Sequence, residues 1–138
     1  YADAQRLGVT LYSNDTAAVG GALRASPKVI SNENILFQFA RSGWSSVWTS
    51  MLSGTPVVVP EYDAEDDPEI YFNNRSIEAL KIGFIWRGEP LEDILKSTAE
   101  LKASCGRITK EIKERWGTVD GNYYSAKLFA DDFIENFL

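Results

Sequence analysis

The segment from Arg41 to Ser46 holds the residue types best suited to bind an anionic group. Arg41 supplies a fixed positive charge, and Gly43 lets the backbone approach a ligand closely. Hydroxyl donors lie on both sides of this glycine, at Ser42, Ser45 and Ser46. The next residues read as a helix, whose unpaired N-terminal amides favour negative charge. The segment therefore predicts a diphosphate-binding turn, which a β-branched residue in place of Gly43 would strain.

A plainer interpretation of this segment stays open. It matches neither GxGxxG nor GxxxxGK[ST], the two common phosphate-binding patterns. Ser45 or Ser46 can be a simple helix N-cap, and Gly43 a simple turn residue. On pattern alone, a helix start without a ligand is the more common case.

Further polar residues follow about twenty positions later. Residues 61–69 contain six carboxylates, which we interpret as a solvated loop that lacks the ligand spacing of an EF-hand. Glu69 and Asn73 lie at the start of the next predicted helix, where a carboxylate and an amide can hydrogen-bond to sugar hydroxyls. Alternatively, Asn73 and Asn74 only satisfy the start of that helix. Trp44 can line the same pocket as the turn.

The composition limits the chemistry of the chain. Its 138 residues carry 14 basic and 20 acidic side chains, a net charge of −6, which argues against a nucleic-acid partner. The absence of histidine excludes Ser-His-Asp triads and the usual zinc sites, and we expect no metal site. The single cysteine, Cys105, excludes an internal disulfide framework and is compatible with the cytoplasm. No apolar run approaches the roughly 20 residues that span a bilayer, so we expect no transmembrane segment.

Hydrophobic patterns predict the elements that would hold the turn in place. We expect strands at 9–12, 28–31, 56–59 and 82–86, and helices at 14–26, 45–54, 68–80, 91–116 and after Asp120. Residues 32–40 fit either a helical turn or an extended run. Strands that alternate with helices predict one α/β domain over 1–138, a Rossmann-like open parallel sheet with helices on both faces. In such sheets ligands bind beyond the carboxyl ends of the strands.

Residues 40–86 resemble the donor-binding, C-terminal half of GT-B glycosyltransferases. The family's pieces occur here in the family's order, at Arg41-Ser42-Gly43, Ser53-Gly54-Thr55-Pro56, Val57 to Pro60, Asn73-Asn74 and Gly83. The letters RSG and YFNN look most like the lipid II-forming GlcNAc transferase. The letters GWSS look like the plant-type and antibiotic UDP-glycosyltransferases.

The resemblance implies transfer of a sugar from a nucleotide diphosphate donor, with UDP as the expected nucleotide, to an acceptor hydroxyl. It implies donor contacts at Arg41, Ser42, Gly43, Trp44, Ser45, Ser46, Glu69 and Asn73. The acceptor site and any catalytic base would lie in an N-terminal domain of the same protein, so no catalytic residue is assigned here. We expect the chain to be a fragment that is inactive alone. Its uncovered apolar surface would suit the missing domain or a homodimer.

Two alternatives stay open. One is a nucleotide-sugar 2-epimerase of the same architecture, which the lack of histidine and the GWSS turn disfavour. The other is a non-catalytic binding module that kept the fold and lost the chemistry. Thr49 favours this module, because it stands where family members often carry a glutamate that grips the ribose.

Overall fold

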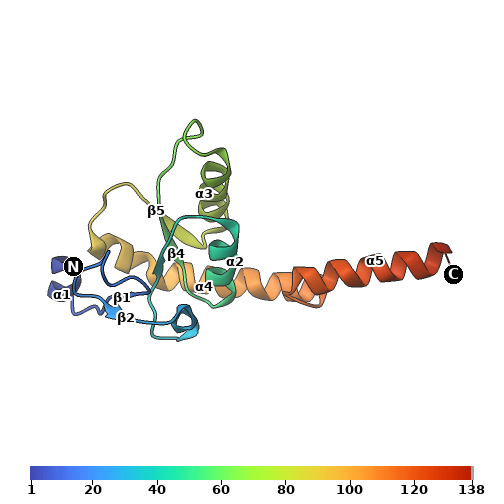
Figure 1. Cartoon of the computed structure of the whole chain (residues 1–138), viewed down its shortest axis with the longest axis horizontal. Coiled ribbons are helices and arrows are strands. Elements are labelled where there is room, and N and C mark those ends of the chain that lie inside the picture. Colours follow the sequence, from blue (N-terminus) through green and yellow to red (C-terminus); the bar gives the residue numbers. More distant parts are fainter. Residues whose placement is uncertain (138) are drawn as a thin grey trace.

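The computed structural model describes residues 1–137 and shows a mixed α/β chain (Figure 1). The N-terminal part contains α1 (Ala2–Arg6), β1 (Tyr12–Ser13), β2 (Leu23–Arg24) and the 3₁₀ helix η1 (Pro27–Ser31). The central part contains β3 (Gln38–Phe39), α2 (Trp44–Leu52), β4 (Val57–Pro60), α3 (Pro68–Leu80) and β5 (Gly83–Trp86). Two helices follow, α4 (Leu91–Trp116) and α5 (Gly121–Phe137).

The larger sheet has three parallel strands in the order β3-β4-β5. β4 pairs with β5 along four residues, from Val57 opposite Gly83 to Pro60 opposite Trp86. Parallel neighbours need a crossover connection, which α2 and α3 supply. The strands predicted at 56–59 and 82–86 are confirmed to within one residue at each end. Because all three strands run the same way, the β3–α2 turn, the β4–α3 loop and the residues after β5 share one edge of the sheet.

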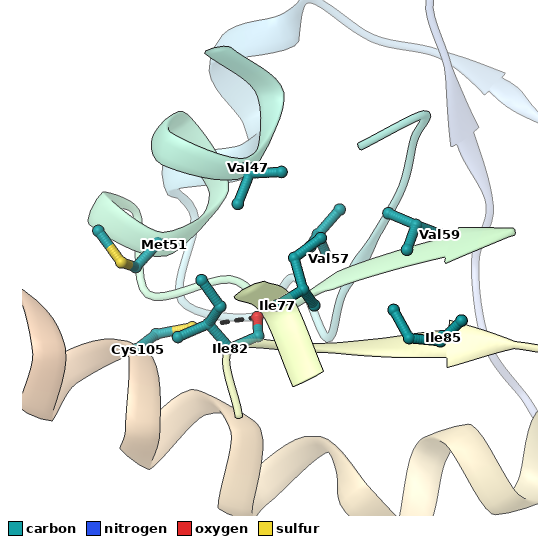
Figure 2. Close-up of a cluster of buried hydrophobic side chains, with 8 residues drawn as sticks. All are labelled: Val47, Met51, Val57, Val59, Ile77, Ile82, Ile85 and Cys105. Atoms are coloured by element: carbon teal, nitrogen blue, oxygen red, sulfur yellow. Dashed lines mark hydrogen bonds between the residues drawn. The ribbon is translucent and has the colours of Figure 1, made fainter. Parts of the chain in front are cut away.

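The core forms around β4, whose three valines are at most 1% exposed. A strand buried on both faces is apolar along its whole length, as expected for a parallel sheet. Figure 2 shows the side chains of α2, β4, α3, β5 and α4 that meet in the core, with Ile82 just before β5. The cluster consists of Val47, Met51, Val57, Val59, Ile77, Ile82, Ile85 and Cys105. Gly83 is fixed by this packing, since an added Cβ would overlap the Val57 carbonyl oxygen and lie 2.7 Å from Ile77 Cγ2.

The long amphipathic helix predicted over 91–116 is confirmed as α4. Ile94 and Cys105 are buried, and Ile108 and Ile112 pack against the core cluster from its edge. Thr109 also donates a hydrogen bond to the Met51 carbonyl oxygen (3.4 Å), which ties α4 to the end of α2. The apolar stripe of α4 therefore packs against the core cluster, as the sequence pattern predicted.

The prediction of a helix over 14–26 is wrong. Residues in this range form turns and then β2, which pairs in parallel with β1 in a separate two-stranded sheet. Asp15 Oδ1 accepts hydrogen bonds from the amides of Ala17 (3.0 Å) and Ala18 (3.3 Å), so its side chain stabilises a local turn. Gly21 then adopts a φ of +81°, which a right-handed helix does not permit.

The prediction of a strand at 28–31 is also wrong, because these residues belong to η1. Pro27 begins this helix, and Ser26 Oγ accepts a hydrogen bond from the Lys28 amide (3.4 Å). The strand found nearest to the one expected at 9–12 is Tyr12–Ser13, which overlaps that range only at Tyr12. The 32–40 region, left open by the sequence, supplies the extended β3. The α/β class and the parallel strands are thus confirmed, but the sheets within residues 1–137 have only two and three strands. The single open Rossmann-like sheet stays a prediction.

The final helix, α5, begins after Asp120 as predicted, because Asp120 Oδ1 accepts hydrogen bonds from the amides of Asn122 (3.0 Å) and Tyr123 (3.1 Å). It extends past the end of α4 and away from the sheet (Figure 1). Tyr123, Phe129 and Ile134 of this helix are exposed. Within residues 1–137, no helix is both long enough and apolar enough to cross a membrane.

Candidate functional site

The β3–α2 turn directly follows the carboxyl end of β3, the extended part of the 32–40 region that the sequence left open. Gly43 is the N-cap of α2, and its carbonyl oxygen accepts hydrogen bonds from the amides of Ser46 (2.9 Å) and Val47 (3.2 Å). Ser45 and Ser46 are therefore inside the helix, and neither is its N-cap. Trp44 and Ser45 are exposed and Ser46 is half-buried, so the first turn of α2 presents an indole and two hydroxyls at the surface.

The expected strain at Gly43 is not supported. Its φ is −57° and its ψ is 137°, a conformation open to any residue. A Cβ at this position would meet no atom within 4 Å. The open space leaves the backbone accessible from outside, which is compatible with close approach by a ligand. A larger side chain at position 43 would therefore act on a ligand and not on the fold.

Ser42 is fully buried and supports the turn from inside. Its hydroxyl donates to Asn74 Oδ1 (2.5 Å) and lies 3.3 Å from the Ile70 carbonyl oxygen. The Asn74 amide donates to the Pro60 carbonyl oxygen (2.9 Å), and the Asn73 amide donates to the Ser42 carbonyl oxygen (2.7 Å). These four bonds hold α3, the β3–α2 turn and the end of β4 together. The sequence suggested that Asn73 and Asn74 either contact a sugar or satisfy the start of the helix. In the structure they have a different use, which is to hold the turn in position.

Arg41 lies beside the turn, with its guanidinium paired to Asp67 Oδ2. The other oxygen of Asp67 caps α3 by accepting a hydrogen bond from the Ile70 amide (3.2 Å). The guanidinium also lies over the ring of Tyr62, 5.8 Å from its centroid. The Arg41 side chain remains 60% exposed, so the cation is reachable by a ligand from solvent.

The predicted site residues are therefore brought together in two layers. Arg41, Gly43, Trp44, Ser45 and Ser46 form an outer layer on the turn and the start of α2, whereas Ser42 and Asn73 form the inner support. Glu69 lies in the first turn of α3, where it is exposed. Among the described residues, the Glu69 side chain makes no hydrogen bond or ion pair with the turn.

A polar pocket of about 90 Å³ opens next to the turn and was missed by the sequence analysis. It lies between α3 and the carboxyl ends of β4 and β5. Its lining comprises Glu61, Tyr62, Tyr71, Asn74, Arg75, Glu78, Ile85 and Arg87. Two signals in the sequence indicate this pocket. Tyr71, Arg75 and Glu78 have the i, i+4, i+7 spacing of one helix face. In addition, Glu61 and Arg87 each directly follow a strand.

The charges around this polar pocket form one connected network. Arg87 Nε donates to Glu61 Oε1 (2.8 Å), and Arg87 Nη2 lies 3.6 Å from Glu78 Oε1. Arg75 Nη1 lies 3.8 Å from Glu78 Oε2, and Arg75 Nη2 donates to the Tyr71 hydroxyl (3.1 Å). The hydrogen bond with Glu61 raises the pKa of Arg87, and that with Tyr71 raises the pKa of Arg75. Both guanidiniums are therefore permanently charged donors.

Residues 1–137 contain no group of three or more Asp, Glu, Cys or His side chains arranged to hold a metal ion. The arrangement at the sheet edge can instead bind an anion through hydroxyls, amides and Arg41, beside a polar pocket. Comparisons of the chain with known protein families, with curated proteins and with solved structures found no match.

Proposed function

We propose that this chain binds a nucleotide diphosphate sugar, with the diphosphate against the first turn of α2, and serves as the donor-binding part of a glycosyltransferase. The observation that carries the proposal is the position of this turn. It directly follows a parallel strand, it presents Ser45, Ser46 and an accessible Gly43 backbone to solvent, and Arg41 lies beside it. Carboxyl ends of parallel strands are where open α/β sheets bind ligands.

The proposed chemistry is stabilisation of a leaving group. When the bond between the sugar and the diphosphate breaks, negative charge grows on the phosphate oxygens. The α2 amides, the hydroxyls of Ser45 and Ser46 and the Arg41 guanidinium are the donors that would stabilise this charge. The acceptor and any base that deprotonates it would come from a second domain, and the nucleotide expected is UDP.

The pairing of Arg41 with Asp67 is compatible with this role. An exposed ion pair contributes only about 0–1 kcal/mol, because water screens both charges. A diphosphate carries more charge than one carboxylate, and Arg41 can therefore exchange Asp67 for the ligand. Asp67 keeps its other role as the cap of α3 when this happens.

A second candidate is a binding module without transfer chemistry. The observation that favours it is that the Ser42 hydroxyl and the Asn73 amide, two of the eight expected donor contacts, are already used in internal hydrogen bonds. This module would bind the nucleotide but would neither transfer nor release the sugar.

Calorimetric titration of UDP and of uridine into the chain tests the proposal. We expect UDP to bind more tightly than uridine, because uridine lacks the diphosphate. Ser46→Ala should weaken UDP binding by about 0.5–1.5 kcal/mol, the usual net contribution of one hydrogen bond. Ser125→Ala, at an exposed position on α5, is the matched control and should have no effect. Equal binding of UDP and uridine, or an unchanged Ser46→Ala variant, would contradict the diphosphate site.

A further inference from the structure

We infer that the polar pocket between α3 and β5 is the subsite for the sugar ring of the proposed nucleotide-sugar ligand. This inference rests on the proposed function and adds the location and the chemical class of the group next to the diphosphate. It assigns the ring to Glu61, Tyr71, Arg75, Glu78 and Arg87, in place of the sugar contacts expected at Glu69 and Asn73.

Two side chains join the pocket to the turn. Asn74 lines the pocket and accepts the hydrogen bond of the Ser42 hydroxyl, so one residue separates the pocket from the turn. Tyr62 also lines the pocket, and its ring lies under the Arg41 guanidinium. Asn74 and Tyr62 therefore connect the proposed diphosphate site to the pocket, which makes the pocket the candidate for the attached sugar.

The balance of charge identifies the kind of group that the pocket accepts. Two guanidiniums, Arg75 and Arg87, face two carboxylates, Glu61 and Glu78, so the lining has no net charge. An anionic ligand would be attracted by the arginines but repelled by the glutamates, and a cationic ligand would meet the reverse. A neutral ligand with many hydroxyls meets neither penalty.

The hydrogen-bonding groups of the pocket match such a ligand. The arginines only donate, the carboxylates only accept, and the Tyr71 hydroxyl does both, while each sugar hydroxyl can donate and accept. The ion pairs in the network are exposed and weak, so a sugar hydroxyl can replace part of each pair.

The test is titration of UDP, UDP-glucose, UDP-N-acetylglucosamine and UDP-glucuronic acid into the chain and three variants. Glu78→Gln removes one acceptor charge from the pocket, and Tyr71→Phe removes only a hydroxyl. Glu65→Gln is the matched control, because Glu65 is an exposed carboxylate of the acidic loop that does not line the pocket. Thermal unfolding of each variant shows that it is folded.

We expect at least one of the two neutral sugar nucleotides to bind more tightly than UDP, and UDP-glucuronic acid to gain no advantage over them. Glu78→Gln and Tyr71→Phe should each weaken binding of that neutral sugar nucleotide by about two- to tenfold and leave UDP binding unchanged. Glu65→Gln should change neither. If Glu78→Gln does not fold, Tyr71→Phe alone decides the matter.

The outcomes separate the two proposals. If no UDP binds at all, the proposed function itself is overturned and the subsite falls with it. If UDP binds but the sugar adds no affinity, or if the pocket variants weaken UDP and the sugar nucleotide equally, only the subsite is overturned. A preference for the glucuronic acid form would contradict the neutral-ligand argument.

Discussion

Asn74 is the residue on which the geometry of the sheet edge depends most. It is 5% exposed, and its amide group bonds to Ser42 on one side and to the Pro60 carbonyl oxygen on the other. Only a side chain with both a donor and an acceptor in this position can satisfy both partners. A change here leaves two buried polar groups without their partner.

Asn74→Ala should therefore destabilise the chain by about 1–3 kcal/mol, the cost of leaving a buried polar group unsatisfied. Urea unfolding followed by circular dichroism measures the difference. Asn122→Ala, at an exposed position near the start of α5, is the control and should change the free energy of unfolding by less than about 0.5 kcal/mol. Equal stability of the Asn74→Ala variant and the parent would refute the positioning role.

Cys105 gives the chain a dependence on alkaline pH. Its thiol is fully buried beside the Ile82 carbonyl oxygen (3.6 Å), and burial raises its pKa from the usual 9.0 to about 11. The folded state then keeps a proton that the unfolded state releases above pH 9.0. The contribution of this thiol to stability is complete below pH 9.0 and is lost as the pH rises towards about 11.

Urea unfolding at pH 8.0 and at about pH 10.5 should show this loss. The parent is expected to lose roughly 1–3 kcal/mol more than Cys105→Ala between the two pH values, since the variant has no thiol to titrate. Lysines and tyrosines titrate in both proteins and cancel in the comparison. A larger loss in the variant than in the parent would show that the thiol does not titrate as its burial requires.

At the scale of elements, the sequence was informative where one local rule governed the structure. Pro68 and the capping carboxylate of Asp67 define the start of α3, and Gly54, with a φ of +69°, defines the stop after α2. The apolar period over 91–116 gives α4, and the valine run gives β4. In each case the signal lies within the element itself.

The wrong predictions at 14–26 and 28–31 reflect local turn and capping signals that were not recognised. The other failures occurred where long-range contacts decided the structure. β1, β2 and β3 are two residues long, and they are defined by pairing with a distant strand and not by their own pattern. Likewise, Ser42 and Asn73 were expected to contact the donor, but both point inward, and this orientation depends on residues about thirty positions apart in the sequence. The polar pocket was missed for the same reason, since its charges come from two loop positions and one helix face.

The contrast between α4 and α5 leads to a prediction about element stability. α4 is anchored in the core, whereas Phe129 of α5 is 74% exposed. Phe129→Ser should therefore change the free energy of unfolding by less than about 0.5 kcal/mol, as for other exposed positions. Val59→Ala, in the core, should cost about 1–3 kcal/mol by the same measurement. A large loss from Phe129→Ser would show that α5 buries this ring in solution, for example in a second copy of the chain.

At the scale of the whole molecule, one end of the sheet combines the features that the proposed function needs. The carboxyl ends of β3, β4 and β5 carry the α2 turn, Arg41 and the polar pocket. The final helix, α5, extends away from the sheet (Figure 1). The chain has a net charge of −6, so anion binding here depends on local donors and not on the overall field.

Amide NMR spectra of the isotopically labelled chain, recorded as UDP is added, test this central claim most directly, because they locate the ligand as well as detect it. We predict that the largest shift changes fall on the amides of Gly43, Trp44, Ser45 and Ser46, with smaller ones at Asn73 and Asn74, and none on α5. Changes that are spread evenly over the chain, or that are confined to residues remote from the α2 turn, would contradict the assignment of this turn as the diphosphate site.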